Sequence, residues 1–580
     1  MIKRLARYGI LVAVLLILGG CDVISDRSAK PSPDWSRGLR IGVASLSQPV
    51  ALQIDGEGHA HLIWYTRLEE VSKLHYAQLD DQAKVLVERD LEIPLSDPHR
   101  PQLLLDQRGN MHLALLAREE DLEGSMKSLF HFLLGDGGEV LSEPARLSLP
   151  GKEVESYQMC LGQEGRVEVF WAGKEGIYHL GLDERGDVIS PSTLIVPQGT
   201  DPSAQVDRSG TIHLAWFQEP FPQSLALYYA VFQGLGQSPS PKEVEGVRLT
   251  QFGTGMSASL YGPVLGLDVD NVYIFWAIER RTGLEQGTAQ SHYVSFPLGQ
   301  PSPLVPVPVD IVESDFVTMP SVTEGQRNEL AALFTVWLGP SDLQRTKTES
   351  PALLSIRKPT VQLVMAVFTE GEMMSYQLAA KTGSTSLRSN LVADPASNLH
   401  LAWFDAAGFG RYDVYYASTS PLVKASLDRT SPQDVLLKAA DLALGMLSGV
   451  ALLPFVVLWL FLPLLWLVLF YVFVGEEELE LRRVKVALGI AIALYMGAKL
   501  LLLPSSLLYA PFLDQMPPQL SSALVSGVPL LILALALAAV YAYTRQAERA
   551  TLFPAFLIFA VTDTLVSLAI YAPGIFGVGS

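Results

Sequence analysis

The sequence predicts an all-β propeller of about seven blades, with six or eight as alternatives, followed by an α-helical membrane domain of four transmembrane helices. Two observations support this prediction. A hairpin unit with the same turn and the same aromatic positions returns along residues 39–420, and such a repeat is typical of propeller blades. The chain after residue 434 consists largely of long apolar segments, which are typical of membrane-spanning helices.

The hairpin unit is clearest between Pro202 and Phe232. The turn Asp207–Gly210 precedes a strand-like run, Thr211–Trp216, and a second run, Leu227–Ala230, follows after a polar gap. Aspartate caps its own backbone in such a turn, and glycine accepts the positive φ that a chain reversal needs. The unit therefore predicts a pair of antiparallel strands.

About seven copies of the unit follow one another at a period of roughly 45 to 65 residues. The copies are Asp55–Trp64 with Leu74–Ala77, Asp106–Leu115 with Leu129–His131, Gly162–Trp171 with Ile177–His179, Asp207–Trp216 with Leu227–Ala230, Asp268–Trp276 with Ser291–Tyr293, a degraded copy at Glu324–Trp337 with Met374–Tyr376, and Asp394–Trp403 with Val414–Ala417.

Alternation along each strand assigns the side chains to two faces. In the fourth copy Leu214 and Trp216 share one face, while His213 and Ala215 share the other. We expect the tryptophan to lie in the core between blades and the histidine to have a strand-surface role. The tyrosine pairs Tyr228–Tyr229 and Tyr415–Tyr416 either fill blade interfaces or line a carbohydrate-binding face, because aromatic rings stack on sugars.

The repeats resemble the sialidase-like β-propeller repeats of bacterial secreted proteins, best in Asn398–Trp403 and Asp413–Ala417. They lack the spacing of the Asp-box, which has glycine two residues after the aspartate and tryptophan three further on. Arg40–Gly42 is the nearest match to the sialidase Arg-Ile-Pro segment, with glycine in place of proline. The arginine triad and the Tyr/Glu nucleophile pair that the resemblance would imply are therefore not assigned, and no catalytic residue is predicted.

Residues 1–20 combine a basic start with an apolar run, Ile10–Leu18, that has the length of a secretory signal. Leu18–Cys21 resembles the bacterial lipobox, which implies lipidation of Cys21 as the mature N-terminus and membrane retention through Asp22. An ordinary signal peptide or an uncleaved anchor is the alternative. Residues 21–38 are polar and proline-containing, which predicts a tether between the lipid and the propeller at 39–420.

The predicted membrane domain begins after a linker and interfacial helix over 421–449. Arginine and lysine residues follow the first and third apolar segments, whereas the loop between the second and third carries only Asp514. The positive-inside rule then places the propeller on the extracytoplasmic side of a bacterial cytoplasmic membrane. The four apolar segments, within a domain at 450–580, are Val450–Val474, Val486–Leu503, Leu524–Tyr543 and Leu552–Tyr571.

Two charges interrupt the apolar segments. Lys499 lies fourteen residues beyond Lys485, and Asp563 lies fourteen beyond Arg549. At 1.5 Å per residue both reach a depth of roughly 21 Å, and an unpaired charge there costs at least about 2.5 kcal/mol. We therefore predict a Lys499–Asp563 ion pair. It either registers the helices or belongs to a proton or ion path, and the alternative is Lys499 snorkelling outward while Asp563 bonds a neighbouring threonine.

Composition excludes several functions. The net charge is −18 and no basic stripe is present, so nucleic acid is not an expected partner. His59 and His61 could form half of a zinc site, but no third ligand follows from the spacing, so neither a metal nor a cofactor is predicted. Cys160 is expected to be a small buried residue.

These observations favour a membrane-anchored binding or scaffolding lipoprotein whose propeller contacts a glycan, peptide or protein partner. A sialidase-like glycoside hydrolase with a membrane anchor is the alternative. A sensor or transport component acting through the four helices is the weaker alternative, because it depends only on the Lys499–Asp563 pair.

Overall fold

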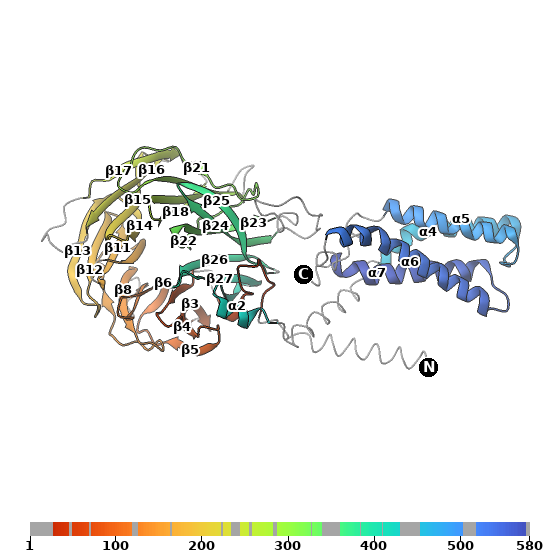
Figure 1. Ribbon diagram of the computed structural model, residues 1–580, viewed down its shortest axis with the longest axis horizontal. Coiled ribbons are helices and arrows are strands. Elements are labelled where there is room, and N and C mark those ends of the chain that lie inside the picture. The colour runs from red at the N-terminus through yellow and green to blue at the C-terminus, as the bar shows by residue number, and fades with distance from the viewer. Residues whose placement is uncertain are drawn as a thin grey trace. The chain divides into compact units, whose positions relative to one another are not determined.

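The structure is a computed structural model, in which two compact units are described separately (Figure 1). It describes residues 27–45, 49–68, 71–118, 126–162, 165–221, 224–233, 244–253, 258–281, 287–325, 328–338, 360–382, 384–408, 410–429, 453–502 and 518–575. The first unit contains the β-strands, and the second contains the C-terminal helices. Cys21 and the signal segment, and most of the predicted interfacial helix, lie outside the described residues.

The first unit is a propeller of seven four-stranded antiparallel sheets, which confirms the predicted fold class and fixes the blade number. Blades 1 to 4 are β2–β5 (Ala51–Ile54, Ala60–Leu68, Val71–Leu79, Val85–Leu91), β6–β9 (Ser96–Leu105, Met111–Arg118, Ser128–Leu134, Ala145–Arg146), β10–β13 (Ser156–Leu161, Val167–Gly173, Gly176–Leu182, Val188–Pro197) and β14–β17 (Thr200–Val206, Thr211–Phe221, Ser224–Gln233, Val247–Gly253). Blades 5 and 6 are β18–β21 (Ala258–Leu267, Asn271–Arg280, Ala289–Pro297, Val307–Pro308) and β22–β25 (Ser321–Glu324, Leu330–Leu338, Thr360–Thr369, Glu372–Ala380).

Blade 7 closes the ring with strands from both ends of the propeller. It contains β26 (Ser386–Ala393), β27 (Leu399–Gly408) and β28 (Arg411–Ser418), and its outer strand is β1 (Leu39–Ala44). Leu39 pairs with Tyr416, and Ala44 pairs with Tyr412. Pairing β1 with β28 closes the ring, because strands from both ends of the propeller chain then share one blade.

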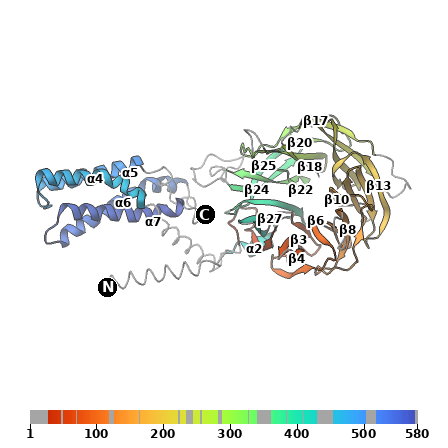
Figure 2. The same ribbon diagram turned by 180° about the vertical axis from the view of Figure 1, so that it is seen from behind.

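The first strand of each blade lies nearest the propeller axis. Neighbouring blades contact each other chiefly through these first strands, such as β10 with β14 and β14 with β18, and Figures 1 and 2 show the outer strands β13 and β17 on the rim. All first strands run in the same direction, so they all begin at one end of the axis. We call this the start end, and we call the opposite end, where the Asp turns connect the first and second strands, the turn end.

The expected tether is shorter than the sequence suggested. Residues 27–38 pack on blade 7, with Trp35 and Ser36 fully buried and the Ser36 backbone N–H donating to the Ser418 carbonyl at 2.9 Å. Gly38 fits beneath Trp403, whose ring lies 2.5 Å from where a Cβ would stand. The polar composition of this segment suggested a tether, but the buried Trp35 anchors it on the propeller.

The beginning of the expected linker also belongs to the propeller. Helix α2 (Pro421–Leu427) buries Val423 and Leu427 in the cluster that contains Trp64. Lys30 pairs with Asp428 at 2.6 Å, so residues from both ends of the propeller meet beside this helix. The linker predicted from residue 421 therefore cannot begin before residue 430.

The tryptophans of five blades are fully buried, as the alternation predicted: Trp64, Trp171, Trp216, Trp276 and Trp403. The degraded sixth copy was read in the wrong register. Ala331 pairs with Thr323 in blade 6 at the position where His400 pairs with Val392 in blade 7. Three residues further along the strand, Phe334 therefore occupies the position of Trp403, and Trp337 does not. Phe334 is fully buried, whereas Trp337 is 44% exposed. The second strand of that copy was also misplaced, because β24 pairs with β23 while Met374–Tyr376 lies in β25.

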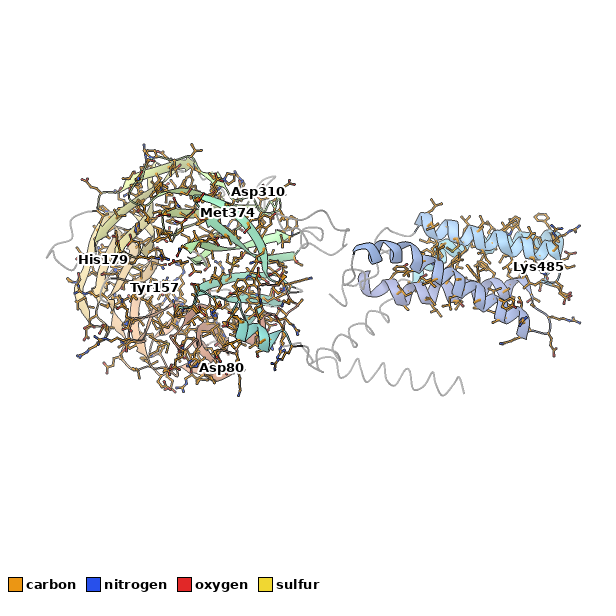
Figure 3. The ribbon with its side chains drawn as sticks, in the orientation of Figure 1. Asp80, Tyr157, His179, Asp310, Met374 and Lys485 are labelled. Atoms are coloured by element: carbon orange, nitrogen blue, oxygen red, sulfur yellow. The ribbon has the colours of Figure 1, made fainter. Side chains whose placement is uncertain are left out.

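The second unit contains four helices long and apolar enough to cross a membrane: α4 (Leu453–Val474), α5 (Arg482–Leu502), α6 (Pro518–Gln546) and α7 (Leu552–Ile575). Pro463 lies inside α4, which continues as a single helix as expected. The α4–α5 and α6–α7 connections are joined by backbone hydrogen bonds from Leu479 to Ala550 and from Leu552 to Glu477. The basic residues that flank the helices therefore lie at one end of the bundle, where Figure 3 labels Lys485.

Candidate functional site

At the turn end of the propeller, buried hydrogen-bond chains link the Asp turns to the next two strands. In blade 4 the Asp207 carboxylate accepts hydrogen bonds from the backbone N–H groups of Ser209 and Thr211. His213 Nε2 lies 3.2 Å from Asp207 Oδ2, and His213 Nδ1 lies 2.6 Å from the Tyr229 hydroxyl. Blade 7 repeats the chain with Asp394, His400 and Tyr416, at 3.2 and 2.6 Å.

These contacts correct the surface role expected for the histidines. His213 and His400 are 2% exposed, and Tyr229 and Tyr416 are fully buried. A histidine followed by a tyrosine sixteen residues later, in both copies, was the signal that could have revealed the chain. The neighbouring tyrosines stack on the blade tryptophans, Tyr415 on Trp403 at 5.2 Å, so the tyrosine pairs fill the blades rather than line a carbohydrate-binding face.

Other blades preserve the chain with different residues. Blade 3 has Gly162 in place of the turn aspartate, Glu168 in place of the histidine and His179 in place of the tyrosine, and the Glu168–His179 contact is 2.8 Å. Blade 5 uses Tyr273, whose hydroxyl donates to Asp268 at 2.7 Å. In blades 3 and 5 these substitutions keep the buried polar groups paired, so the chains there link neighbouring strands. In blade 2, by contrast, His112 Nε2 is buried without a hydrogen-bond partner.

Electrostatics support this structural role. Burial opposes ionisation of Asp394, but hydrogen bonds from His400 and Asn398 outweigh it and lower the pKa of this carboxyl to about 2. Burial lowers the pKa of His213, so this histidine remains a neutral hydrogen-bonding group at neutral pH.

The start end of the propeller has a different character. Four non-glycine residues near the beginnings of first strands adopt positive φ angles between 50° and 51°: Asp97, Arg100, Asp201 and Arg388. Such conformations cost of order 1–3 kcal/mol each and concentrate at functional sites. All four side chains are exposed, and the four residues lie at the register shifts of β6, β14 and β26, in blades 2, 4 and 7.

Blades 2, 3 and 4 join through a cluster beside Arg100. The Arg100 guanidinium donates to the Glu155 carbonyl at 2.8 Å, and the Tyr157 hydroxyl donates to the carbonyls of Arg100 and Ala114. Figure 3 labels Tyr157 within the ring of blades. Asp201 is exposed as a residue, but neighbouring protein atoms partly desolvate its carboxyl. This desolvation raises the pKa of Asp201, whereas a hydrogen bond from Ser156 opposes the rise.

Blade 7 adds a buried carboxyl at the same end. Asp405 accepts hydrogen bonds from the hydroxyls of Thr382 at 2.7 Å and Ser386 at 3.2 Å. Burial raises the pKa of Asp405 to about 6, and Asp413, its partner on the adjacent strand, adds to the shift. Ser386 is two residues before Arg388, so this carboxyl lies beside the strained part of β26.

The arrangement does not reproduce the sialidase pattern. Arg100 and Arg388 are the two arginines within the first strands that the structure describes, where a carboxylate-binding triad would need three. The Tyr157 phenol is buried against backbone carbonyls, and burial raises its pKa, so it is poorly suited to act as a nucleophile. Arg40, from the Arg-Ile-Gly segment, lies on the outer strand of blade 7 and pairs with Asp413 at 2.8 Å.

In the helical unit, Lys499 of α5 and Asp563 of α7 meet. Lys499 Nζ donates to Asp563 Oδ2 at 2.5 Å and to Ser567 Oγ at 2.7 Å. The Tyr495 hydroxyl also donates to Asp563 Oδ2, at 2.9 Å. Asp563 is 1% exposed and Lys499 is 9% exposed, so the contact is enclosed by the helices.

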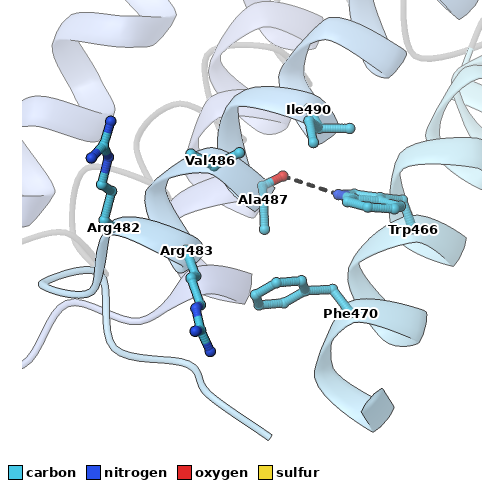
Figure 4. A pocket seen from close by; sticks show the side chains of 7 residues that line it. All are labelled: Trp466, Phe470, Arg482, Arg483, Val486, Ala487 and Ile490. Carbon is cyan, nitrogen blue, oxygen red and sulfur yellow. Dashed lines mark hydrogen bonds between the residues drawn. The ribbon is translucent and has the colours of Figure 1, made fainter. Parts of the chain in front are cut away.

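A groove of about 540 Å³ runs along α4 and α5 (Figure 4). Trp466 and Phe470 line it from α4, and Trp466 Nε1 donates to the Ala487 carbonyl at 3.1 Å. Its remaining lining residues are Arg482, Arg483, Val486, Ala487 and Ile490. An open groove of this kind on an apolar helix pair is ordinary for a membrane bundle and assigns no chemistry by itself.

Comparisons with known proteins identify no family. No protein-family model matches the chain, and no curated protein matches it. Solved structures with similar folds include the polysaccharide lyase Uly1 (8% identity, TM-score 0.43, covering 65% of this chain and 91% of that one) and an ulvan lyase with a bound -[GlcA(1-4)Rha3S]- unit (10%, 0.43, 67% and 99%). A third is the α-L-arabinanase of Penicillium chrysogenum complexed with arabinobiose (12%, 0.33, 68% and 96%). Likenesses this distant identify no activity for the chain.

Proposed function

We propose that this protein is a membrane-anchored extracytoplasmic lipoprotein whose propeller binds a glycan at its start end. The anchor consists of the four apolar helices together with a lipid on Cys21. The arginines and lysines at the α4–α5 and α6–α7 connections support a cytoplasmic location for that end of the bundle, because the positive-inside rule counts Lys and Arg and gives little weight to Asp and Glu.

The observation that carries the proposal is the strain at Asp97, Arg100, Asp201 and Arg388. Glycine would adopt these backbone conformations without cost, whereas each of these positions carries a charged, exposed side chain. Arginine only donates hydrogen bonds and ionised aspartate only accepts them. A surface that carries both kinds of side chain suits sugar hydroxyls, which donate and accept hydrogen bonds, better than it suits an apolar peptide.

Arg388 offers the sharpest test. Arg388→Gly removes the strain and the guanidinium together, so it should raise the stability of the propeller by about 1 kcal/mol while weakening glycan binding at least tenfold. Binding would be measured with the full-length protein in detergent on an array of bacterial and plant polysaccharides. Arg185→Gly is the matched control, because Arg185 is exposed in a turn at the opposite end. Unchanged glycan binding by Arg388→Gly, or capture of proteins alone, contradicts the proposal.

Glycan cleavage is the second candidate, favoured by Asp405. A carboxyl with a pKa near 6 can donate a proton near neutral pH, although Asp405 is 8% exposed and Asp413, opposite it on the next strand, pairs with Arg40. Incubation with the polysaccharides that bind would distinguish the two candidates. Release of shorter chains by the wild type, lost in Asp405→Asn, would establish cleavage, whereas binding without release would leave a binding module.

A further inference from the structure

The hydrogen-bond chain of blade 1 differs from those of blades 4 and 7. His61 Nδ1 lies 2.8 Å from the Tyr76 hydroxyl and His61 Nε2 lies 3.2 Å from Asp55 Oδ2, as in the other two blades. Here, however, the Tyr76 hydroxyl also contacts the carbonyl of Asp136, at 2.9 Å. Asp136 belongs to the β8–β9 turn of blade 2.

Counting hydrogens shows why this contact matters. In blade 4 the two contacts of the chain are satisfied by two hydrogens, one from the Tyr229 hydroxyl and one from a neutral His213. Blade 1 has three contacts but the same two hydrogens. If Tyr76 donates to the Asp136 carbonyl, His61 must donate from Nδ1, and its Nε2 then presents a lone pair to the Asp55 carboxylate.

A second carboxylate lies close to the Asp55–His61 pair. Donor atoms of Asp55, His61 and Asp136 all lie within 4.8 Å of one another. The turn that carries Asp136 passes tightly over Tyr76, because a Cβ at Gly138 would stand 2.4 Å from the tyrosine ring. Gly138 has a φ of 76°, so this turn is built around glycine and holds Asp136 in place.

The geometry suits a metal ion. Two ligand bonds of about 2.0–2.1 Å whose outer atoms are 3.2 Å apart enclose an angle of about 100°, close to tetrahedral. Asp136 is exposed, and the contact of its Oδ1 with Gln78 Nε2 is long, at 3.4 Å, so a rotation of its side chain can bring a carboxylate oxygen to the ion. His61 would then donate its other ring N–H to Tyr76, the outer-shell hydrogen bond that metal-bound histidines usually make.

We propose that Asp55, His61 and Asp136 bind a divalent transition-metal ion, of which Zn²⁺ fits the donor set best, joining blades 1 and 2 at the turn end. The ion takes the place of the missing hydrogen between His61 Nε2 and the two carboxylates. A proton on His61 Nε2 is the competing occupant of this position, and the test below distinguishes the two. His59, whose Nδ1 lies 3.1 Å from Asp55 Oδ2, adds a further nitrogen beside the site, and Asp136 supplies the third ligand that the His59–His61 spacing lacked.

The test uses full-length protein in detergent, stripped with a chelator and titrated with Co²⁺, whose visible absorption reports nitrogen and oxygen ligation. We expect one saturable site per chain that Zn²⁺ displaces, with a Zn²⁺-dependent rise in melting temperature. Asp136→Asn preserves the backbone carbonyl that receives Tyr76 and should weaken Co²⁺ binding at least tenfold. Asp81→Asn, at the corresponding position of the β4–β5 turn, should bind as the wild type does.

Three outcomes would overturn the proposal. One is the absence of saturable Co²⁺ binding, and another is equal binding by wild type and Asp136→Asn. The third is a melting temperature of the chelator-stripped protein that does not rise on addition of Zn²⁺.

Discussion

The contact between Lys499 and Asp563 leads to a quantitative prediction about the helical unit. In Lys499→Met, Asp563 loses its cation while it remains 1% exposed, with the Tyr495 hydroxyl as a remaining donor. Removing one partner of a buried ion pair costs about 3–5 kcal/mol. The Tyr495 hydroxyl still donates to the Asp563 carboxylate, which keeps the expected loss at the lower end of this range. We therefore expect Lys499→Met to destabilise the helices by about 3 kcal/mol.

The double variant separates the pair from the general effect of the substitutions. Lys499→Met combined with Asp563→Leu leaves no uncompensated charge, so its cost should be under about 1 kcal/mol, far below the sum of the two single changes. The stabilities of the wild type, the two single variants and the double variant are measured by SDS-induced unfolding of the full-length protein in detergent micelles, followed by the helical circular dichroism signal.

Lys485→Met is the matched control for the lysine-to-methionine change, because Lys485 is an exposed residue in the first turn of α5. It should unfold within about 0.5 kcal/mol of the wild type. The reasoning is refuted if the single changes add up in the double variant, because the two side chains would then be energetically independent.

Three further predictions concern the propeller. The folded-state pKa of Asp405, about 6, lies above the ordinary value of 3.8, so the folded protein holds an extra proton between pH 4 and 6. The stability of the propeller should therefore fall by about 3 kcal/mol as the pH rises through this window. The melting temperature of Asp405→Asn should fall less over the same range. Phe334→Ala should cost about 3–5 kcal/mol and Trp337→Ala less than about 1 kcal/mol in urea unfolding, whereas the register read from the sequence requires the reverse order. His213→Phe removes the histidine contacts of the buried Tyr229 hydroxyl and of Asp207 Oδ2, so it should lower stability by about 1–3 kcal/mol. A variant as stable as the wild type would show that the chain does not hold blade 4 together.

The sequence determined the architecture because its signals are local and repeated. Each blade is specified locally, by an aspartate turn, an alternating strand and a tryptophan at a fixed offset. Because the unit repeats, the pattern can be recognised even when one copy is degraded. The apolar segments are equally local, since a helix that crosses lipid must satisfy its own backbone. The juxtaposition of Lys499 and Asp563 was also accessible, because helical rise converts sequence position into depth.

Tertiary structure decided what depends on contacts between blades. The burial of His213 follows from the Tyr229 hydroxyl that reaches it from the next strand, and strand alternation alone cannot show that both faces of a blade are covered. Asp136 approaches His61 only because blade 2 folds against blade 1, and the strain at Arg388 exists only in backbone geometry. The register of blade 6 was misread for the same reason: pairing with β22, rather than the position of a tryptophan in the sequence, determines which side chain enters the core.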